Sequence, residues 1–242
     1  MSSIISYIMV AVTSLAISPF VVAFTNKFIE EEKNINSGSA FKFNFRENIS
    51  FDNKISLILP FLWIALFYVL GPGLDFALFA FLSILLVISF FVDIKAQIIP
   101  NETNFVGFIV GIIVAYIKLT QNYDAGLDAL FGMFTGAGIF LAIAFLALII
   151  YRKVGMGMGD VKLMGMLGLF FGFANTIQVF VLSFLIGAII SLFLLATKRK
   201  KTSDYIPFGP FIVLASVITM FIPATTTVNY LLSVLWWMVV LV

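Results

Sequence analysis

The sequence predicts an all-α integral membrane protein, a polytopic helix bundle of about eight transmembrane helices. Hydrophobic residues make up 62% of the chain and charged residues 11%, and the mean hydropathy is +1.15. This composition leaves too little polar surface to cover a water-soluble globule. The apolar residues form long runs that do not alternate with polar ones, which favours helices over a membrane β-barrel.

The apolar runs predict nine helices in order along the chain. They cover residues 4–25, 55–71, 74–92, 104–119, 126–151, 161–173, 176–197, 207–222 and 228–242. The first run has no basic residues before it and is longer than the apolar part of a cleaved signal, so we expect it to be retained. The runs 161–173 and 228–242 are shorter than a full membrane span, which needs about 20 residues.

The basic residues predict the orientation in the membrane. With the N-terminus outside, every Lys and Arg except Lys118 falls on the cytoplasmic side, as the positive-inside rule requires. This assignment needs 161–173 to cross the membrane, because Lys198 to Lys201 would otherwise be exported. It places Asp93 and Asp160 on the same, cytoplasmic side of the inner membrane.

The one sizeable polar segment lies between the first two apolar runs, from Asn26 to Lys54. We expect residues 30–40 to be mobile and residues 41–51 to lie against the membrane or form a short strand. The chain is therefore divided into a first helix with a short cytoplasmic segment, 1–54, and a membrane-embedded domain, 55–242.

Composition also excludes several kinds of chemistry. The chain has no cysteine and no histidine, which removes thiolate and imidazole metal ligands as well as Ser-His and Cys-His nucleophiles. We therefore expect no metal. A net charge of +2, spread along the chain, gives no reason to expect a nucleic-acid partner, so the lipid bilayer is the predicted surrounding.

The segment FFVDIKAQIIPNETN contains the first candidate acid. Asp93 ends one predicted helix, and Pro100 with Asn101 opens the next. An aspartate at a membrane boundary can also be simply solvated, and Glu102 or Thr103 can serve only to cap the following helix.

The segment VGMGMGDVKLMGMLG contains the second candidate, Asp160, preceded by Gly155, Gly157 and Gly159. Glycines let a backbone approach an extended peptide closely and pair with it, and the extended form is the one in which a peptide bond is cut. The alternative is that these glycines serve helix packing and that Asp160 caps the next helix.

Together the two aspartates suggest an aspartyl dyad. One ionised carboxylate would take a proton from water while a protonated partner polarises the peptide carbonyl. Carboxylates about 5 Å apart repel by about 3 kcal/mol at an effective dielectric near 20, which keeps one of them protonated. The competing hypothesis is a small membrane transporter or proton-relay protein. Such a protein should carry ionisable residues near mid-membrane, whereas here they lie at the boundaries.

Three segments resemble the type IV prepilin leader peptidases, which belong with archaeal preflagellin peptidases to the GxGD-type aspartyl proteases. The segments are VDIKAQIIPN, GMGDVKLMGMLGLFFG and PFGPFIVLA, within residues 75–222. The resemblance implies that Asp93 and Asp160 are catalytic, that Gly157, Gly159 and Lys162 belong to the site motif, and that type IV prepilin or pseudopilin precursors are the substrates. It implies no metal and no cofactor for proteolysis.

The resemblance weakens towards the N-terminus. The bacterial members carry there a cytoplasmic loop with paired cysteines and a region that contributes to N-methylation of the product. This chain has no cysteine, so S-adenosylmethionine is expected only if methylation is retained, and the chain is closer to a minimal peptidase. Presenilin-like proteins share the G-x-G-D pattern, but their other motifs are missing.

Other features are best explained by structure. The small-xxx-small patterns at Gly107/Gly111, Gly132/Gly136 and Gly168/Gly172 predict close helix packing. Pro207 and Pro210 would start or kink a helix beside the site, with a gating role expected for Gly209. Glu102 would pair with basic residues of a leader peptide, or is a solvated loop residue.

Overall fold

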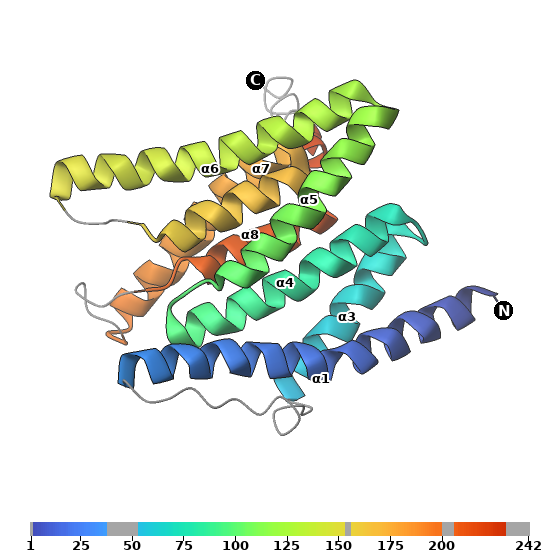
Figure 1. The fold of residues 1–242 in the computed structure, drawn as a ribbon, viewed down its shortest axis with the longest axis horizontal. Coiled ribbons are helices and arrows are strands. Elements are labelled where there is room, and N and C mark those ends of the chain that lie inside the picture. The colour runs from blue at the N-terminus through green and yellow to red at the C-terminus, as the bar shows by residue number, and fades with distance from the viewer. Residues whose placement is uncertain (1, 38–52, 153–155, 200–205, 231–242) are drawn as a thin grey trace, which may run out of the picture. The chain divides into compact units, whose positions relative to one another are not determined.

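The computed structural model describes residues 2–37, 53–152, 156–199 and 206–230, and in these ranges it contains helices and no strand (Figure 1). The expected all-α polytopic class is confirmed. The helices are α1 (Ser2–Ser37), α3 (Asn53–Leu70), α4 (Leu74–Ala96), α5 (Asn101–Gln121), α6 (Tyr123–Tyr151), α7 (Met158–Ala196), α8 (Gly209–Phe221) and a short helix Ala224–Tyr230.

Five of the described helices are long and apolar enough to cross a membrane, namely α1, α4, α5, α6 and α7. A sixth span results if α8 and Ala224–Tyr230, bent by 76° at their break, are counted together. This is fewer than the about eight spans expected from runs of about 20 apolar residues. The difference arises because the predicted runs 161–173 and 176–197 are counted together as α7, although this element is broken at Gly172, and because the apolar part of α3 is short. Most of the predicted run 228–242 lies outside the described residues, including Trp236 and Trp237.

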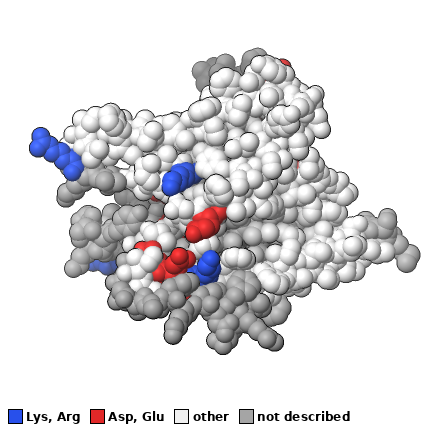
Figure 2. All heavy atoms as spheres, viewed as in Figure 1, with Lys and Arg blue, Asp and Glu red and all other residues white. Residues whose placement is uncertain are grey.

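The surface of the helices is rich in large apolar side chains. Phe61 and Tyr68 on α3 are each 78% exposed, and Phe134 on α6 is 67% exposed. Figure 2 shows a face on which most atoms belong to uncharged residues and the charged side chains gather in a few places. Such a surface is unsuited to water and suits contact with lipid.

The chain forms two compact units. Unit one contains residues 1–107 and 205–213, and unit two contains residues 108–204 and 214–242. Each is described by itself below. The division into 1–54 and 55–242 expected from the sequence stays a prediction.

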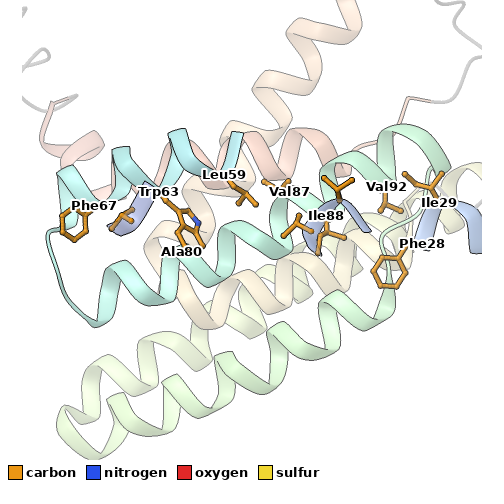
Figure 3. Close-up of a cluster of buried hydrophobic side chains, with 12 residues drawn as sticks. Phe28, Ile29, Leu59, Trp63, Phe67, Ala80, Val87, Ile88 and Val92 are labelled. Atoms are coloured by element: carbon orange, nitrogen blue, oxygen red, sulfur yellow. The ribbon is translucent and has the colours of Figure 1, made fainter. Parts of the chain in front are cut away.

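The core of unit one lies between α1, α3 and α4 (Figure 3). At one end, the Trp63 Nε1–H donates a hydrogen bond of 2.9 Å to the Ser83 hydroxyl. At the other end, Phe28 and Ile29 of α1 lie beside Val92 of α4. The C-terminal part of α1 is thereby fixed next to the end of α4 that carries Asp93.

Helix α1 is longer than the sequence predicted. The expectation of a mobile polar segment is wrong for residues 30–37, which continue the helix to Ser37. Phe28 and Ile29 are only 6% and 5% exposed, so packing extends beyond the predicted end at residue 25. Glu and Lys are good helix formers and allow the helix to continue. The segment 41–51, expected to form a strand or lie on the membrane, is outside the described residues.

In unit two, α7 folds back on itself at Gly172. A Cβ on Gly136 of α6 would touch the Met164 carbonyl and would lie 3.0 Å from the Thr176 side chain. These two residues would be about 18 Å apart in a straight helix. Gly172 has φ +75°, and the Phe173 N–H beyond it donates a hydrogen bond of 3.1 Å to Oδ1 of Asp128. The two halves of α7 therefore match the two helices predicted separately.

The helix contacts in unit two use the predicted small residues. A Cβ on Gly132 would touch the Gly168 backbone, and a Cβ on Gly168 would touch the Gly132 backbone. A Cβ on Gly111 of α5 would lie 2.8 Å from the Leu169 side chain. Since only glycine permits these approaches, the packing role predicted for these patterns is confirmed at these positions.

Candidate active site

Asp93 lies in the last turn of α4 and is buried, with 4% of its surface exposed. The helix ends at Ala96, and Gln97 adopts a left-handed conformation with its N–H bonded to the Asp93 carbonyl at 2.9 Å. Within the described residues, Oδ2 of Asp93 has no hydrogen-bond partner. Because a buried carboxylate oxygen is costly to leave unpaired, this atom indicates a functional position.

Gly209, the first residue of α8, lies directly against the Asp93 carboxyl group. A Cβ at this position would be 2.5 Å from Oδ2 of Asp93 and 3.2 Å from Cδ1 of Ile99. Glycine is therefore needed here for space, and the expected gating role of Gly209 stays a prediction. Pro207, two residues earlier, is partly buried.

The other residues of the first motif lie in the turn between α4 and α5 and at the start of α5. Pro100 is buried, and its carbonyl accepts a hydrogen bond of 2.8 Å from the Thr103 hydroxyl. Asn101 begins α5 and is exposed, as is Glu102. The Thr103 side chain therefore bonds to the preceding turn rather than capping free N–H groups of α5.

Asp160 lies in the first turn of α7 and is 6% exposed. Gly157 is the N-cap of that helix, and its carbonyl accepts a hydrogen bond of 3.1 Å from the Asp160 N–H. A Cβ on Gly157 would lie 3.3 Å from Oδ2 of Asp160, so this glycine leaves the carboxyl open on that side. The positive end of the helix dipole favours a carboxylate here.

The remaining residues of the second motif surround this helix start. Gly157 and Lys162 are exposed and Gly159 is partly buried. Gly155 lies outside the described residues. Gly157 thus meets Asp160 within unit two, as Gly209 meets Asp93 within unit one.

Asp93 and Asp160 share one property that sets them apart. Among the described residues, they are the only buried carboxylic acids. The alternative of simply solvated boundary aspartates does not fit this burial. They belong to different compact units, and their predicted approach to one another stays a prediction.

Two buried polar residues of unit one were missed by the sequence analysis. Ser89 and Asn104 are each 2% exposed, and their side-chain polar atoms have no hydrogen-bond partner within the described residues. The spacing of four residues between Ser89 and Asp93, which puts them on one helix face, was a usable signal for Ser89.

The described residues contain no group of three His, Cys, Asp or Glu side chains that could hold a metal ion. Asp93 and Asp160 each offer a carboxyl group next to a glycine, Gly209 for the first and Gly157 for the second. Carboxyl groups of this kind can transfer protons to and from a bound water.

The comparison with known proteins covers the part of the chain that contains these two positions. Residues 79–192 match the type IV leader peptidase family, a range that includes both Asp93 and Asp160. Over these residues, somewhat less than half of its length, the chain is similar to that family. The third resembling segment, Pro207 to Ala215, lies beyond the matched range.

Curated relatives carry the name prepilin leader peptidase/N-methyltransferase. The protein of Legionella pneumophila is 34% identical over 149 residues, 60% of this chain and 50% of the relative. That of Pseudomonas aeruginosa is 31% identical over 140 residues, 58% of this chain and 47% of the relative. That of Aeromonas salmonicida is 26% identical over 185 residues, 75% of this chain and 61% of the relative. The chain thus spans about half the length of the first two relatives. No solved structure matches it.

Proposed function

We propose that this chain is a membrane aspartyl endopeptidase that removes the leader peptide of type IV prepilin-like or pseudopilin precursors. Asp93 and Asp160 are the catalytic pair in this proposal. The observation that carries it is that these two aspartates, both within the type IV leader peptidase match, are the only buried carboxylic acids in the described residues.

The proposed reaction uses water and no covalent intermediate. The ionised aspartate takes a proton from the water, whose oxygen attacks the peptide carbonyl carbon. The protonated aspartate donates a hydrogen bond to the carbonyl oxygen, and a proton then passes to the leaving amine. The unpaired Oδ2 of Asp93 supports a role for this carboxyl in binding water or substrate.

We place this chemistry at the cytoplasmic face of the inner membrane. The support is the position of the basic residues, all of which except Lys118 lie on that side when the N-terminus is outside. The leader peptides of the substrates would be met there before the precursor is exported. Gly157, Gly159 and Lys162 would then contact the extended precursor, and Glu102 would meet basic residues of its leader.

The proposal is tested with purified protein in detergent and a prepilin-like precursor. Asp93→Asn and Asp160→Asn should each lower the cleavage rate by at least about 100-fold, the effect of losing a general acid or base. Asp75→Asn is a matched control, because Asp75 lies at the other end of α4 and is exposed. Full cleavage by both single variants would exclude the aspartyl mechanism. Absence of cleavage by the wild type together with ion or proton transport would favour the transporter hypothesis.

The second half of the relatives' name, N-methyltransferase, is a separate matter. S-adenosylmethionine would be needed only if the chain also methylates its product, and the absence of the paired cysteines argues against this part of the activity. We expect the mature N-terminus of the product to have its unmodified mass when it is measured by mass spectrometry. A product heavier by one methyl group would show that methylation is retained.

A further inference from the structure

Within the described residues, unit one contains buried side-chain polar atoms that have no hydrogen-bond partner. The atoms are Oγ of Ser89, Oδ2 of Asp93, and both Oδ1 and Nδ2 of Asn104. Within the part of the chain that the structure describes, no other buried side-chain atom lacks a partner. Buried polar groups are normally paired, so four such atoms in one region indicate a place for a ligand rather than for packing.

The three residues lie near the end of α4 and near the start of α5, the next helix along the chain. Ser89 and Asp93 are four residues apart on α4 and therefore neighbours on one helix face. Asn104 lies one turn into α5, with its N–H bonded to the Pro100 carbonyl at 3.4 Å.

The turn between α4 and α5 is folded towards the Asp93 carboxyl group. A single point, the Cβ position of Gly209, lies 2.5 Å from Oδ2 of Asp93 and 3.2 Å from Cδ1 of Ile99 in the turn. Asp93 at the end of α4 and Ile99 in the turn thus flank the same small space. Asn104 follows Ile99 by five residues, at the start of α5.

A partly buried asparagine of unit two behaves differently. Asn175 of α7 donates a hydrogen bond of 2.9 Å to the Phe171 carbonyl and accepts one of 2.7 Å from the Ala224 N–H. Its side chain is therefore a structural link between two backbone segments. Asn104 has the same donor and acceptor groups, and within the described residues neither has a partner.

We propose that Asn104 binds a backbone peptide group of the precursor next to the bond that is cut. A carboxamide presents a donor and an acceptor side by side, and a peptide group in an extended chain offers the complementary C=O and N–H. Such pairing would recognise the extended backbone of the precursor and would not depend on its side chains. This inference rests on the proposed endopeptidase function.

The test compares Asn104→Leu with wild type, using purified protein in detergent and a synthetic prepilin-like peptide. The KM should rise by about tenfold or more, equal to about 1.4 kcal/mol of binding free energy, while kcat changes less. The melting temperature should stay the same or rise, because leucine fills a similar volume without unpaired polar atoms. Asn104→Ala should show the same change in KM and serves if the leucine variant does not fold.

Asn175→Ala is the matched control. It should lower the melting temperature, because it removes two hydrogen bonds, and leave KM unchanged. An unchanged KM in both Asn104 variants would overturn the role of Asn104, as would a fall in kcat alone. If the wild type cleaves the peptide and the Asn104 variants have the same KM as the wild type, only this inference is refuted. If the wild type does not cleave the peptide, the proposed function itself is refuted.

Discussion

Gly209 and Asp93 are in direct contact. Adding one methyl group at residue 209 therefore tests whether the position of the Asp93 carboxyl group matters for cleavage. The Cβ of Gly209→Ala would be 2.5 Å from Oδ2 of Asp93, closer than the two atoms can approach. The carboxyl must therefore move, and misplacing a catalytic group by about 1 Å can lower the rate by about 100-fold. We expect Gly209→Ala to lower precursor cleavage by about 10- to 100-fold with the protein still folded, as measured by cleavage rate and melting temperature.

Gly138→Ala is the control for this substitution, because a Cβ there meets no atom within 4 Å. Alanine is favoured over glycine in a helix by about 0.5–1 kcal/mol, so this variant should keep its cleavage rate and melt at the same or a slightly higher temperature. Wild-type cleavage by Gly209→Ala would show that the position of the Asp93 carboxyl does not limit the reaction.

The two candidate catalytic aspartates could be predicted from the sequence, whereas the residues that surround them were harder to predict. Asp93 and Asp160 could be found because carboxylates are rare in this apolar chain and each follows or precedes a predicted helix. The contact between Gly209 and Asp93 joins residues more than one hundred positions apart, and no local pattern encodes it. Asn104 was missed because an asparagine near the start of a helix is ordinarily exposed or a cap.

Among the helices, the fold-back of α7 depends on the conformation of one residue. Gly172 has φ +75°, and a Cβ there would also touch the Asp128 carboxylate. Gly172→Ala should therefore combine backbone strain of about 1–3 kcal/mol with a steric clash. We expect it to lower the melting temperature clearly and to reduce the yield of folded protein in detergent.

Gly71→Ala separates the two causes. Gly71 has φ +70°, but a Cβ there meets no atom within 4 Å, so only the strain should be felt. The expected order of stability is wild type, Gly71→Ala and then Gly172→Ala. If both variants melted at the same temperature, the clash with Asp128 would not contribute to the loss of stability.

The contact between α6 and α7 gives a second prediction about helices. A Cβ on Gly168 would touch the carbonyl group of Gly132, part of a backbone that cannot rotate away as a side chain can. Gly168→Ala should force the two helices apart and cost about 1–3 kcal/mol, the usual effect of overpacking. Thermal unfolding in detergent measures this, and equal stability to Gly138→Ala would contradict it.

Helix positions were predictable where apolar runs are long, and helix ends were less so. The run 4–25 gave the existence of α1 but not its extension to Ser37, because residues 30–37 are polar and the packing that fixes them occurs at Phe28 and Ile29. The separate runs 161–173 and 176–197 anticipated the break in α7. The break occurs at Gly172, which has a positive φ, and the Phe173 N–H that follows it donates a hydrogen bond to Asp128 of α6; neither feature is visible in the apolar pattern.

For the molecule as a whole, the distribution of basic residues makes a prediction about membrane sidedness. Helix α5 has 21 residues, about 31 Å at 1.5 Å per residue, enough to cross the apolar layer. The positive-inside rule puts its start on the cytoplasmic side with Asp93, and its end, near Lys118, outside.

The absence of cysteine allows this sidedness to be measured with single introduced thiols. Gln97 and Gln121 are both exposed; Gln97 follows the end of α4, in the turn before α5, and Gln121 is the last residue of α5. In intact cells, Gln121→Cys should react with a membrane-impermeant thiol reagent, whereas Gln97→Cys should react only after the inner membrane is opened. The reverse pattern would place Asp93 on the outer side, away from precursors that have not yet been exported, and cleavage at the cytoplasmic face would then be excluded even if the purified protein cuts them.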